Sequence, residues 1–333
     1  MKKYILIYIC LCILFAGCTS ESSFKEFKNR EVELPPISSG LQMEELDVHP
    51  IGLIFGYCVD SLFLLRTLEY NNSYRVFNAE TFEDYGTVFS TGEGPNEFVN
   101  LATQGQYYTT SDSVMLWVRD AGKRKIRLVN LTQTLAKGEA VITKEYSTKT
   151  NLYNIFAVND TSFVGNTFDG LKWSYAKFNP VTEQITPIFD LLEFKDITFA
   201  SGNTTAKKDM SLMAHAPFFF NQILFYSHDG ANRFSVSLGK PVLFEDLKTK
   251  DYGNRLQYFS NIASSEEHVW ILFKDPENSE PKSSSKIIVM DWDGNPLYLF
   301  DTGKQLRTIF SDFQKGTFYS IDVDEKLYKM TID

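Results

Sequence analysis

The sequence predicts an all-β fold, and within that class a six-bladed β-propeller of four-stranded antiparallel blades. Two repeated patterns predict it: a turn followed by an apolar strand occurs six times, and a second apolar strand follows each copy. The composition agrees, because aromatic residues make up 15% of the 333 residues and favour strands. A two-sheet sandwich is the alternative, although it would not require six matched copies.

The first pattern is a polar turn, often Asp or Asn with Ser or Thr, that leads into an apolar strand. Its copies recur roughly every 45–60 residues, the spacing expected of propeller blades. We expect each copy to contain the turn from the first to the second strand of one blade. The six copies begin at Asp60, Asp112, Asn159, Asn221, Glu266 and Lys315.

The second pattern is another apolar strand after each copy, and a further turn and strand follow most of them. The turn is clearest in Asp291-Trp292-Asp293-Gly294-Asn295. The sixth copy lacks the last strand because the sequence ends at Asp333. We therefore expect the segment 41–49 to complete blade six, so that strands from both ends of the chain close the ring and cover the open sheet edges.

The N-terminus has the pattern of an export signal. Two lysines precede an apolar stretch over 4–16, which is too short to span a membrane as a stable helix. The run Leu14-Phe15-Ala16-Gly17-Cys18 resembles a bacterial lipobox, with Phe15 where Leu is usual. We expect a lipoprotein signal peptide over 1–17 and lipidation of Cys18; an ordinary signal peptide with an incidental cysteine is the alternative.

The rest of the chain divides into a linker and one domain. The segment 18–41 is polar and charged and ends in Pro35-Pro36 and Ser38-Ser39-Gly40, so we expect a flexible tether there. The propeller is expected over 42–333. Without the signal, Cys18 and Cys58 are the only cysteines, which is too few for a disulfide framework.

The charge balance is acidic, with a formal net charge of −9. Loss of the two lysines of the signal leaves 31 basic and 42 acidic residues, a balance of −11. This excludes a nucleic-acid partner, because no basic excess exists to displace phosphate counterions. We interpret the acidity as solubility for a body tethered in the cell envelope, at the outer membrane on its periplasmic or surface side.

Loop length predicts which face of the ring binds. The loops from second to third strands and the crossings between blades share one face, and they are expected to be long. Long loops on a rigid scaffold are where binding is usually placed. The expected loops cover 67–72, 119–124, 166–173, 191–211, 228–232 and 274–285.

Four pairs of residues are candidates for ligand binding on this face, and each pair could instead have a purely structural role. Arg119 and Arg124 lie in a mixed-charge loop that could be a solvated turn. Asp169 and Trp173 could pair a carboxylate with an aromatic platform for a sugar or peptide, or Trp173 could pack against a neighbouring loop. His228 and Asp229 precede a glycine and could simply form a turn. Arg255 and Tyr258 are expected to begin the inner strand of blade five, where both line the channel only if Arg255 still belongs to the loop.

The string Gly92-Glu93-Gly94-Pro95-Asn96-Glu97-Phe98 is the most distinctive of the chain. It fails as a phosphate cradle because the third glycine is missing and Pro95 lacks an N–H donor. We interpret it as a rigid crossing between blades one and two. There Gly92 and Gly94 supply unusual backbone angles, Glu97 caps amides and Phe98 inserts between the blades; ligand contact is the alternative.

No motif predicts catalytic residues, a metal site or a cofactor. The histidines at 49, 215, 228 and 268 lack metal-ligand spacing, and no nucleophile elbow is present. The run from Asp291 has its glycine at the fourth position rather than the sixth and Thr302 at the twelfth, so it indicates a hairpin turn rather than a calcium loop.

Three features together resemble the TolB-like six-bladed propeller lipoproteins of Bacteroidetes. They are the lipobox-like Cys18, the string over 92–98, and Ile288-Val289-Met290-Asp291-Trp292-Asp293-Gly294-Asn295-Pro296. The resemblance covers residues 42–333 of the body and implies a cell-envelope propeller. It implies no reaction and supplies no catalytic residues.

Two functions fit these observations. The first is a lipid-anchored, monomeric binding or scaffold module whose long-loop face takes an envelope protein, a peptide or a glycan. The second is a metal-dependent lactonase or lyase, because such enzymes gather ligands from the inner strands of several blades, where no local motif shows them. Three or more carboxylate or imidazole groups converging at the channel mouth would favour the enzyme, and an apolar or Arg- and Tyr-lined channel would not.

Overall fold

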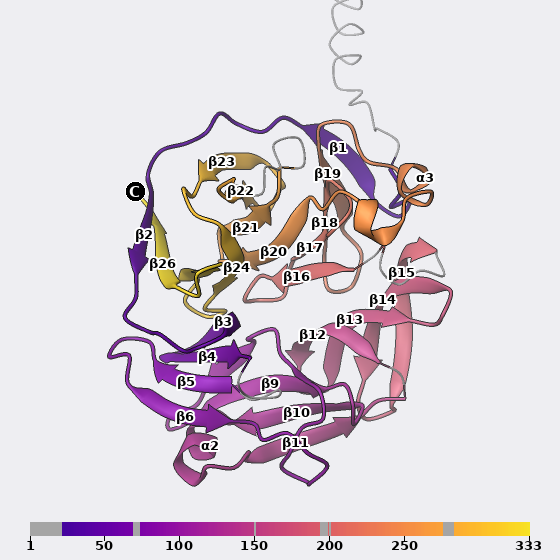
Figure 1. Cartoon of the computed structure of the whole chain (residues 1–333). Coiled ribbons are helices and arrows are strands. Elements are labelled where there is room, and N and C mark those ends of the chain that lie inside the picture. The colour runs from indigo at the N-terminus through magenta and orange to yellow at the C-terminus, as the bar shows by residue number, and fades with distance from the viewer. Residues whose placement is uncertain (1–21, 69–73, 150, 194–198, 200, 276–282) are drawn as a thin grey trace, which may run out of the picture.

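A computed structural model describes residues 22–68, 74–149, 151–193, 199, 201–275 and 283–333. The predicted signal peptide and Cys18 lie outside these residues. The described residues form six small sheets arranged in a ring, and the blades follow one another around the ring in chain order (Figure 1). This confirms the predicted six-bladed propeller.

Each blade runs from an inner strand at the ring centre to an outer strand at the rim, with antiparallel neighbours. Blade one comprises β3 (Leu53–Val59), β4 (Leu62–Thr67), β5 (Tyr74–Asn78) and β6 (Asp84–Val88). Blade two comprises β7 (Leu101–Ala102), β8 (Tyr107–Thr109), β9 (Val114–Asp120), β10 (Lys125–Asn130) and β11 (Ile142–Ser147), with β7 and β8 both pairing β9. Blade three comprises β12 (Leu152–Asn159), β13 (Ser162–Phe168), β14 (Lys172–Asn179) and β15 (Gln184–Glu193).

The second half of the ring repeats this order. Blade four comprises β16 (Gly202–Ala206), β17 (Met213–Pro217), β18 (Gln222–Tyr226) and β19 (Arg233–Leu238). Blade five comprises β20 (Phe259–Ser264), β21 (His268–Phe273), β22 (Lys286–Asp291) and β23 (Pro296–Asp301). Blade six comprises β24 (Leu306–Ser311), β25 (Phe318–Asp322), β26 (Leu327–Ile332) and β2 (Leu41–Glu45). The helical elements are α2 (Leu131–Lys137), α3 (Phe244–Leu247) and the 3-10 turn η1 (Tyr252–Asn254).

The ring is closed as the sequence predicts. β2 pairs antiparallel with β26, from Leu41 opposite Ile332 to Glu45 opposite Tyr328. The outer strand of blade six therefore comes from the N-terminal side of the chain, while its other three strands come from the C-terminal side. This arrangement gives β26 a partner on both edges.

The described part of the predicted tether packs on the propeller. β1 (Lys28–Val32) pairs in parallel with β19 as a fifth strand on blade four. Phe24 and Phe27 are 1% and 5% exposed, and their rings contact Phe220 at 4.9 Å and Phe189 at 5.3 Å between centroids. The polar composition of the segment concealed these two aromatic side chains, whose burial fastens the chain to blades three and four.

The fourth blade is displaced by one strand from its prediction. The copy that begins at Asn221 leads into β18, the third strand of its blade rather than the second. The first strand of the blade, β16, lies inside the segment 191–211, where we expected a long loop. The second strand, β17, begins just after that segment. The short sequence of β16, GNTTA, is polar and small, so it lacks the apolar pattern of a strand.

Aromatic rings pack between neighbouring blades. Trp270 stacks on Phe318 at 4.1 Å between blades five and six, and Phe63 meets Tyr319 edge-on at 4.9 Å between blades one and six. Trp117 contacts Phe163 at 4.9 Å between blades two and three. The aromatic richness of the chain thus holds the ring together through contacts between sheets.

Candidate functional site

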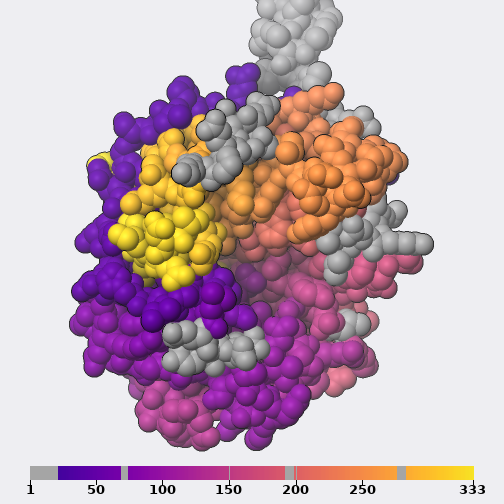
Figure 2. Space-filling view, viewed as in Figure 1, coloured from indigo at the N-terminus to yellow at the C-terminus, as the bar shows by residue number. Residues whose placement is uncertain are grey.

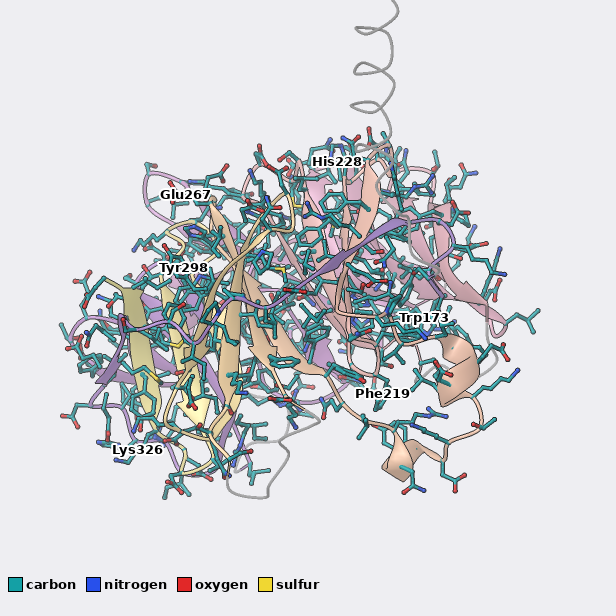
Figure 3. The ribbon with its side chains drawn as sticks, turned by 90° about the horizontal axis from the view of Figure 1, so that it is seen from above. Trp173, Phe219, His228, Glu267, Tyr298 and Lys326 are labelled. Carbon is teal, nitrogen blue, oxygen red and sulfur yellow. The ribbon has the colours of Figure 1, made fainter. Side chains whose placement is uncertain are left out.

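The ring has two faces, which Figure 3 shows edge-on. The turn face carries the turns that join first to second and third to fourth strands, such as 207–212 and 227–232. The crossover face carries the turns between second and third strands and the crossings between blades, such as 218–221 and 239–258. His228 and Glu267 lie at the turn face, while Phe219 and Lys326 lie at the crossover face (Figure 3).

A cavity of about 440 Å³ lies at the centre of the ring. Figure 2 looks onto the crossover face and shows the surface hollowed at this point. Five inner strands, β3, β12, β16, β20 and β24, contribute to its wall, together with the segment between β7 and β8. The lining residues are Ile54, Phe55, Gly56, Tyr57, Gln104, Phe156, Asn203, Thr204, Thr205, Asn261, Ile262, Ala263, Arg307, Thr308, Ile309, Phe310, Ser311 and Phe313.

The turn-face end of the cavity is occupied by Phe313, from the turn that follows β24. Phe313 packs against the core clusters of blades one and two and of blades three and four. The turn is held across the ring, because Gln314 Nε2 donates to the Tyr107 carbonyl at 2.6 Å and the Tyr107 hydroxyl donates to buried Asp312 at 2.7 Å. The cavity is therefore a pocket that a ligand enters from the crossover face.

Polar side chains on the wall link neighbouring blades. Asn203 Nδ2 donates to the Ser260 carbonyl at 3.0 Å, and Asn261 Nδ2 donates to Thr308 Oγ1 at 2.7 Å. Gln104 Nε2 donates to Asn154 Oδ1 at 3.3 Å. Within the described part of the chain, no hydrogen bond is made to Asn203 Oδ1 or Gln104 Oε1. Both oxygens can therefore accept a hydrogen bond from a bound molecule.

Arg307 supplies the charge of the cavity. Its guanidinium donates through Nη1 to the Leu53 carbonyl and through Nη2 to the Val323 carbonyl at 3.3 Å. The described lining contains no Asp, Glu or His, and in the described residues no carboxylate lies within ion-pair distance of Arg307. Burial raises the pKa of the lining residue Tyr57 to about 12, against the opposing effect of Arg66, so its hydroxyl is neutral at physiological pH. The cavity therefore carries a positive charge at its wall.

Arg119 and Arg124, the first predicted pair, lie near one end of β9 and do not line the central cavity. Arg119 belongs to β9, where Nη1 donates to the Leu152 carbonyl and the guanidinium lies 4.8 Å from the centroid of the Tyr153 ring. Burial lowers the pKa of Arg119. Arg124 lies in the turn at φ 53°, and its Nη1 donates to the Lys149 carbonyl at 3.5 Å. Arg119 thus joins blades two and three, and only Arg124 stands in a loop on the crossover face.

Asp169 and Trp173 lie at the turn between β13 and β14, which is shorter than the predicted loop. Asp169 Oδ1 accepts the backbone N–H groups of Leu171 and Lys172, each at 2.9 Å, and these bonds lower the pKa of its carboxyl. Trp173 is 6% exposed and packs edge-on against Tyr153 at 5.2 Å. Trp173 therefore offers no open aromatic platform, and Asp169 stabilises its own turn.

His228 and Asp229 lie on the turn face, opposite to the face on which we expected them. Their turn joins β18 to β19, the third and fourth strands of blade four, because the blade is displaced by one strand. His228 Nδ1 lies 3.0 Å from the Met210 carbonyl, and Asp229 Oδ1 accepts from Ser227 Oγ at 2.5 Å. The bond between Ser227 and Asp229 closes the turn, and His228 ties it to the neighbouring turn 207–212.

Arg255 and Tyr258 precede the inner strand of blade five, which begins at Phe259. Both belong to the crossing 239–258, and neither lines the central cavity. The Arg255 guanidinium lies 3.7 Å from the centroid of the Phe199 ring, and the Tyr258 N–H donates to the Phe218 carbonyl at 2.8 Å. Arg255 therefore belongs to the loop, as one of the alternatives held, and the cavity wall does not include the two residues that the sequence left open for it.

The string 92–98 forms a closed crossing between blades one and two. Glu97 Oε2 accepts the Gly94 N–H at 2.7 Å, and Phe98 is fully buried against Phe89 at 5.4 Å. Gly92 and Gly94 do not have positive φ angles, contrary to our expectation. A side chain at Gly92 would instead overlap the Glu97 carboxylate, so the glycine is needed for close approach.

Arg127, on β10, holds this crossing in place. It is 1% exposed, its Nη1 donates to the Glu97 carbonyl at 2.8 Å, and its guanidinium lies 4.9 Å from the centroid of the Phe98 ring. Its Nε donates to Glu145 at 2.8 Å. Pro95 lies in the same closed loop, in which the backbone and Lys123 satisfy the polar groups that a ligand would need.

The described residues contain no group of three His, Cys, Asp or Glu side chains arranged to hold a metal ion. The cavity wall instead offers amides, hydroxyls, aromatic rings and one guanidinium. Arg307 and Tyr57 are among these groups. Sequence reasoning missed Asn203, Asn261 and Arg307, whose one signal is a polar residue at the second or third position of an inner strand.

In the part of the chain that the structure describes, no helix combines the length and the apolar character required to cross a bilayer.

Comparison with solved structures shows the fold. A member of the DUF4221 family from Bacteroides vulgatus has a TM-score of 0.57 at 11% identity, covering 88% of this chain and 98% of that one. A Bacteroides fragilis protein with the provisional description of an exported protein has a TM-score of 0.58 at 12% identity, covering 92% and 99%. The β-propeller domain of Cps50 (Swd1) from Myceliophteria thermophila has a TM-score of 0.51 at 9% identity, covering 88% and 100%.

No family model and no curated protein matches the sequence. At these identities the structural neighbours establish a β-propeller and no more.

Proposed function

We propose that this protein is a binding module of the cell envelope that takes a ligand, or the end of a ligand chain, in its central cavity. It is a monomeric lipoprotein of the TolB-like propeller type, held at the outer membrane through Cys18. Its ligand is a glycan, a peptide or a segment of an envelope protein. The single observation that carries the binding role is the cavity, which opens on the crossover face and is closed at the other end by Phe313.

The dimensions and lining of the cavity support binding. Its volume of about 440 Å³ lies in the range of ligand pockets, roughly 300–1,000 Å³. Its wall combines apolar side chains such as Ile309 and Phe156 with polar groups from several blades, including Asn203 and Arg307. Such a combination fixes the orientation of a ligand while the apolar surface contributes affinity.

The donor set of the cavity does not suit the metal-dependent alternative. Lactonase-like and lyase-like propellers need several carboxylate or imidazole groups around one ion, and the described lining has none. Backbone and side-chain amides of the wall can hold a ligand without activating water. We therefore propose binding rather than catalysis.

The envelope location is supported by the signal-like N-terminus and by the Bacteroides fragilis neighbour, which has the provisional description of an exported protein. Anchoring fits the position of residues 22–27, which pack on blade four beside α3. Ser23 Oγ accepts the Phe244 N–H at 2.6 Å there. The chain would thus leave the body at the rim of the ring, beside the blade-four part of the crossover face.

A blocked cavity tests the binding role. Ile54 lines the cavity and Ile51 is 69% exposed outside it on the same side of the ring. Binding of the purified protein to glycan arrays and to peptide panels should be lost in Ile54→Trp, whose indole fills the cavity mouth, and kept in Ile51→Trp. Equal binding by the two variants would show that ligands bind elsewhere.

A further inference from the structure

We infer that the cavity takes the end of an oligosaccharide that carries a carboxylate, a uronic acid unit, with the carboxylate on Arg307. This inference rests on the proposed binding function and names its ligand class. Three observations carry it: the single unopposed charge of the wall, the arrangement of the free polar groups around the ring, and the closed end of the cavity.

The positive charge of Arg307 on the cavity wall favours an anionic ligand. The chain as a whole is acidic, at −9, yet the described cavity lining holds Arg307 and no acidic side chain. The nearest bonds of Arg307 are to two backbone carbonyls, which neutralise no charge. A carboxylate brought beside this guanidinium gains an ion pair that no protein group supplies.

Arg307 is positioned for this contact. The carbonyls of Leu53 and Val323 hold Nη1 and Nη2 from β3 and from the turn after β25. A guanidinium has five N–H groups, so three of them remain available after these two bonds. Its planar fork matches the two oxygens of a carboxylate, which makes the pair specific as well as strong.

The other polar groups favour a sugar over a peptide. Asn203 Oδ1 lies on β16 in blade four, and Gln104 Oε1 lies before β8 in blade two, so the free acceptors project from separate blades around the axis. A peptide that extends a sheet needs its partners in a row along one strand edge. The hydroxyls of a sugar radiate from its ring and can donate to acceptors placed around it.

Because the cavity is closed at the turn face, it favours the terminal unit of an oligosaccharide. Phe313 fills the turn-face end, and the bonds of Gln314 and Asp312 to Tyr107 keep it there. A polymer cannot thread through the ring and must enter by its end. Apolar wall residues such as Phe55 and Ile309 can then cover the C–H faces of the terminal sugar.

Calorimetric titration of the whole exported chain tests the inference. The probes are disaccharides of glucuronate, galacturonate, mannuronate and guluronate, each beside its methyl ester. A tripeptide with a free C-terminal carboxylate and its amide form the second arm. At least one uronate disaccharide should bind about tenfold or more tightly than its ester, the loss expected for one charge-assisted bond pair.

Substitution of the arginine locates the effect. Arg307→Gln should weaken the uronate about tenfold and leave the ester unchanged, and Arg307→Lys should recover part of the loss. Arg124→Gln, on the same face but outside the cavity, is the matched control and should change neither. Arg307→Gln also loses the bonds to the Leu53 and Val323 carbonyls, so its melting temperature is measured beside its affinity, and an unchanged affinity for the ester shows that the cavity is intact.

Each other result overturns the inference. Equal affinity for acid and ester, or absence of binding by all four uronates, removes the acidic sugar. Carboxylate-dependent binding of the tripeptide alone replaces the sugar by a peptide terminus and keeps the cavity as the binding site. If Ile54→Trp and Ile51→Trp also bind every ligand of the arrays equally, the proposed function fails with it.

Discussion

Glu97 lies at the centre of the crossing between blades one and two, and its carboxylate occupies the space beside two glycines. It accepts the Gly94 N–H at 2.7 Å, while a Cβ atom on Gly92 would overlap its carboxylate oxygens. The glycines are thus explained by the side chain three to five positions later rather than by their own backbone angles.

Gly92→Ala should lower the free energy of unfolding by about 1–3 kcal/mol, because the new methyl group displaces the Glu97 carboxylate. In a Glu97→Ala background the same change should cost at least about 1 kcal/mol less, since the obstructing group is gone. Urea denaturation of the four proteins in this double-mutant cycle measures both values.

Gly253→Ala is the control for this cycle, because nothing lies within 4 Å of the position of a Cβ there. Its stability should stay within about 0.5 kcal/mol of the wild type. An unchanged cost of Gly92→Ala in the Glu97→Ala background would contradict the steric explanation.

The arginines show how position decides the role of one residue type. Arg119 and Arg127 are engaged between strands and at a buried crossing, so they hold the fold together. Arg307 is exposed at the cavity wall with backbone carbonyls as its partners. The sequence drew attention to Arg119, yet Arg307 has the environment of a binding residue.

At the scale of elements, the pairing of β5 with β6 carries an ion pair between strands. Arg75 Nε donates to Asp84 Oδ2 at 2.9 Å, and the Gly86 N–H donates to Asp84 Oδ1 at 2.9 Å. The hydrogen bonds from Arg75, and then that from Gly86, lower the pKa of the Asp84 carboxyl. The folded state is therefore favoured when this carboxyl is ionised.

This pair predicts a dependence of stability on pH. A carboxyl whose pKa is lowered by folding stabilises the protein fully above its unfolded pKa, about 3.9, and loses that effect as the pH falls through its folded value. The difference in melting temperature between wild type and Asp84→Asn should be constant above about pH 5 and should shrink below about pH 4. Circular dichroism melts across this range measure it.

Arg75→Gln is the companion variant, because it removes the other member of the pair. Its difference in melting temperature from the wild type should shrink in the same way as the pH falls. A difference that persists undiminished at about pH 2.5 would show that the Asp84 ion pair is not its source.

β1 lies in the polar segment that we expected to be a tether, and its pairing with β19 can be tested. Phe24→Ala with Phe27→Ala removes the two buried rings that fasten it to blade four. Amide hydrogen exchange over 234–238 in β19 should then accelerate by about tenfold or more, because β19 loses its outer partner. Mass spectrometry of the exchanged peptides measures the change.

Residues 286–291 of β22 provide the internal control, since no described residue of blade five belongs to the core cluster around these rings, and they should exchange as before. Unchanged exchange over 234–238 would mean that the pairing with β19 does not depend on Phe24 and Phe27.

At the scale of the whole molecule, the attachment of the N-terminal segment sets the orientation of the ring. Phe24 and Phe27 hold the chain on blades three and four, beside the first residue of α3. An anchor at Cys18 would therefore tether the ring by its rim, at blade four. The acidic charge of the body keeps it from lying flat on an anionic bilayer.

Cys18→Ala should transfer the protein from the detergent phase to the aqueous phase in a Triton X-114 partition of host cells, because the proposed lipoprotein attaches to the membrane through acyl chains on this cysteine. Cys58→Ala is the matched control, since Cys58 is 1% exposed within blade one and should remain in the detergent phase. Retention of Cys18→Ala in the detergent phase would show that another segment anchors the protein.

The sequence by itself determined the ring: six copies of a turn and a strand, and a missing outer strand that β2 completes opposite β26. These features are local or follow from counting, so they can be recognised without coordinates. Only the tertiary structure decided the strand order of blade four, the docking of β1 and the cavity. Polar inner strands such as β16 look like loops until neighbouring blades satisfy them. Asn203, Asn261 and Arg307 meet around one axis only because the ring closes, which no local pattern encodes.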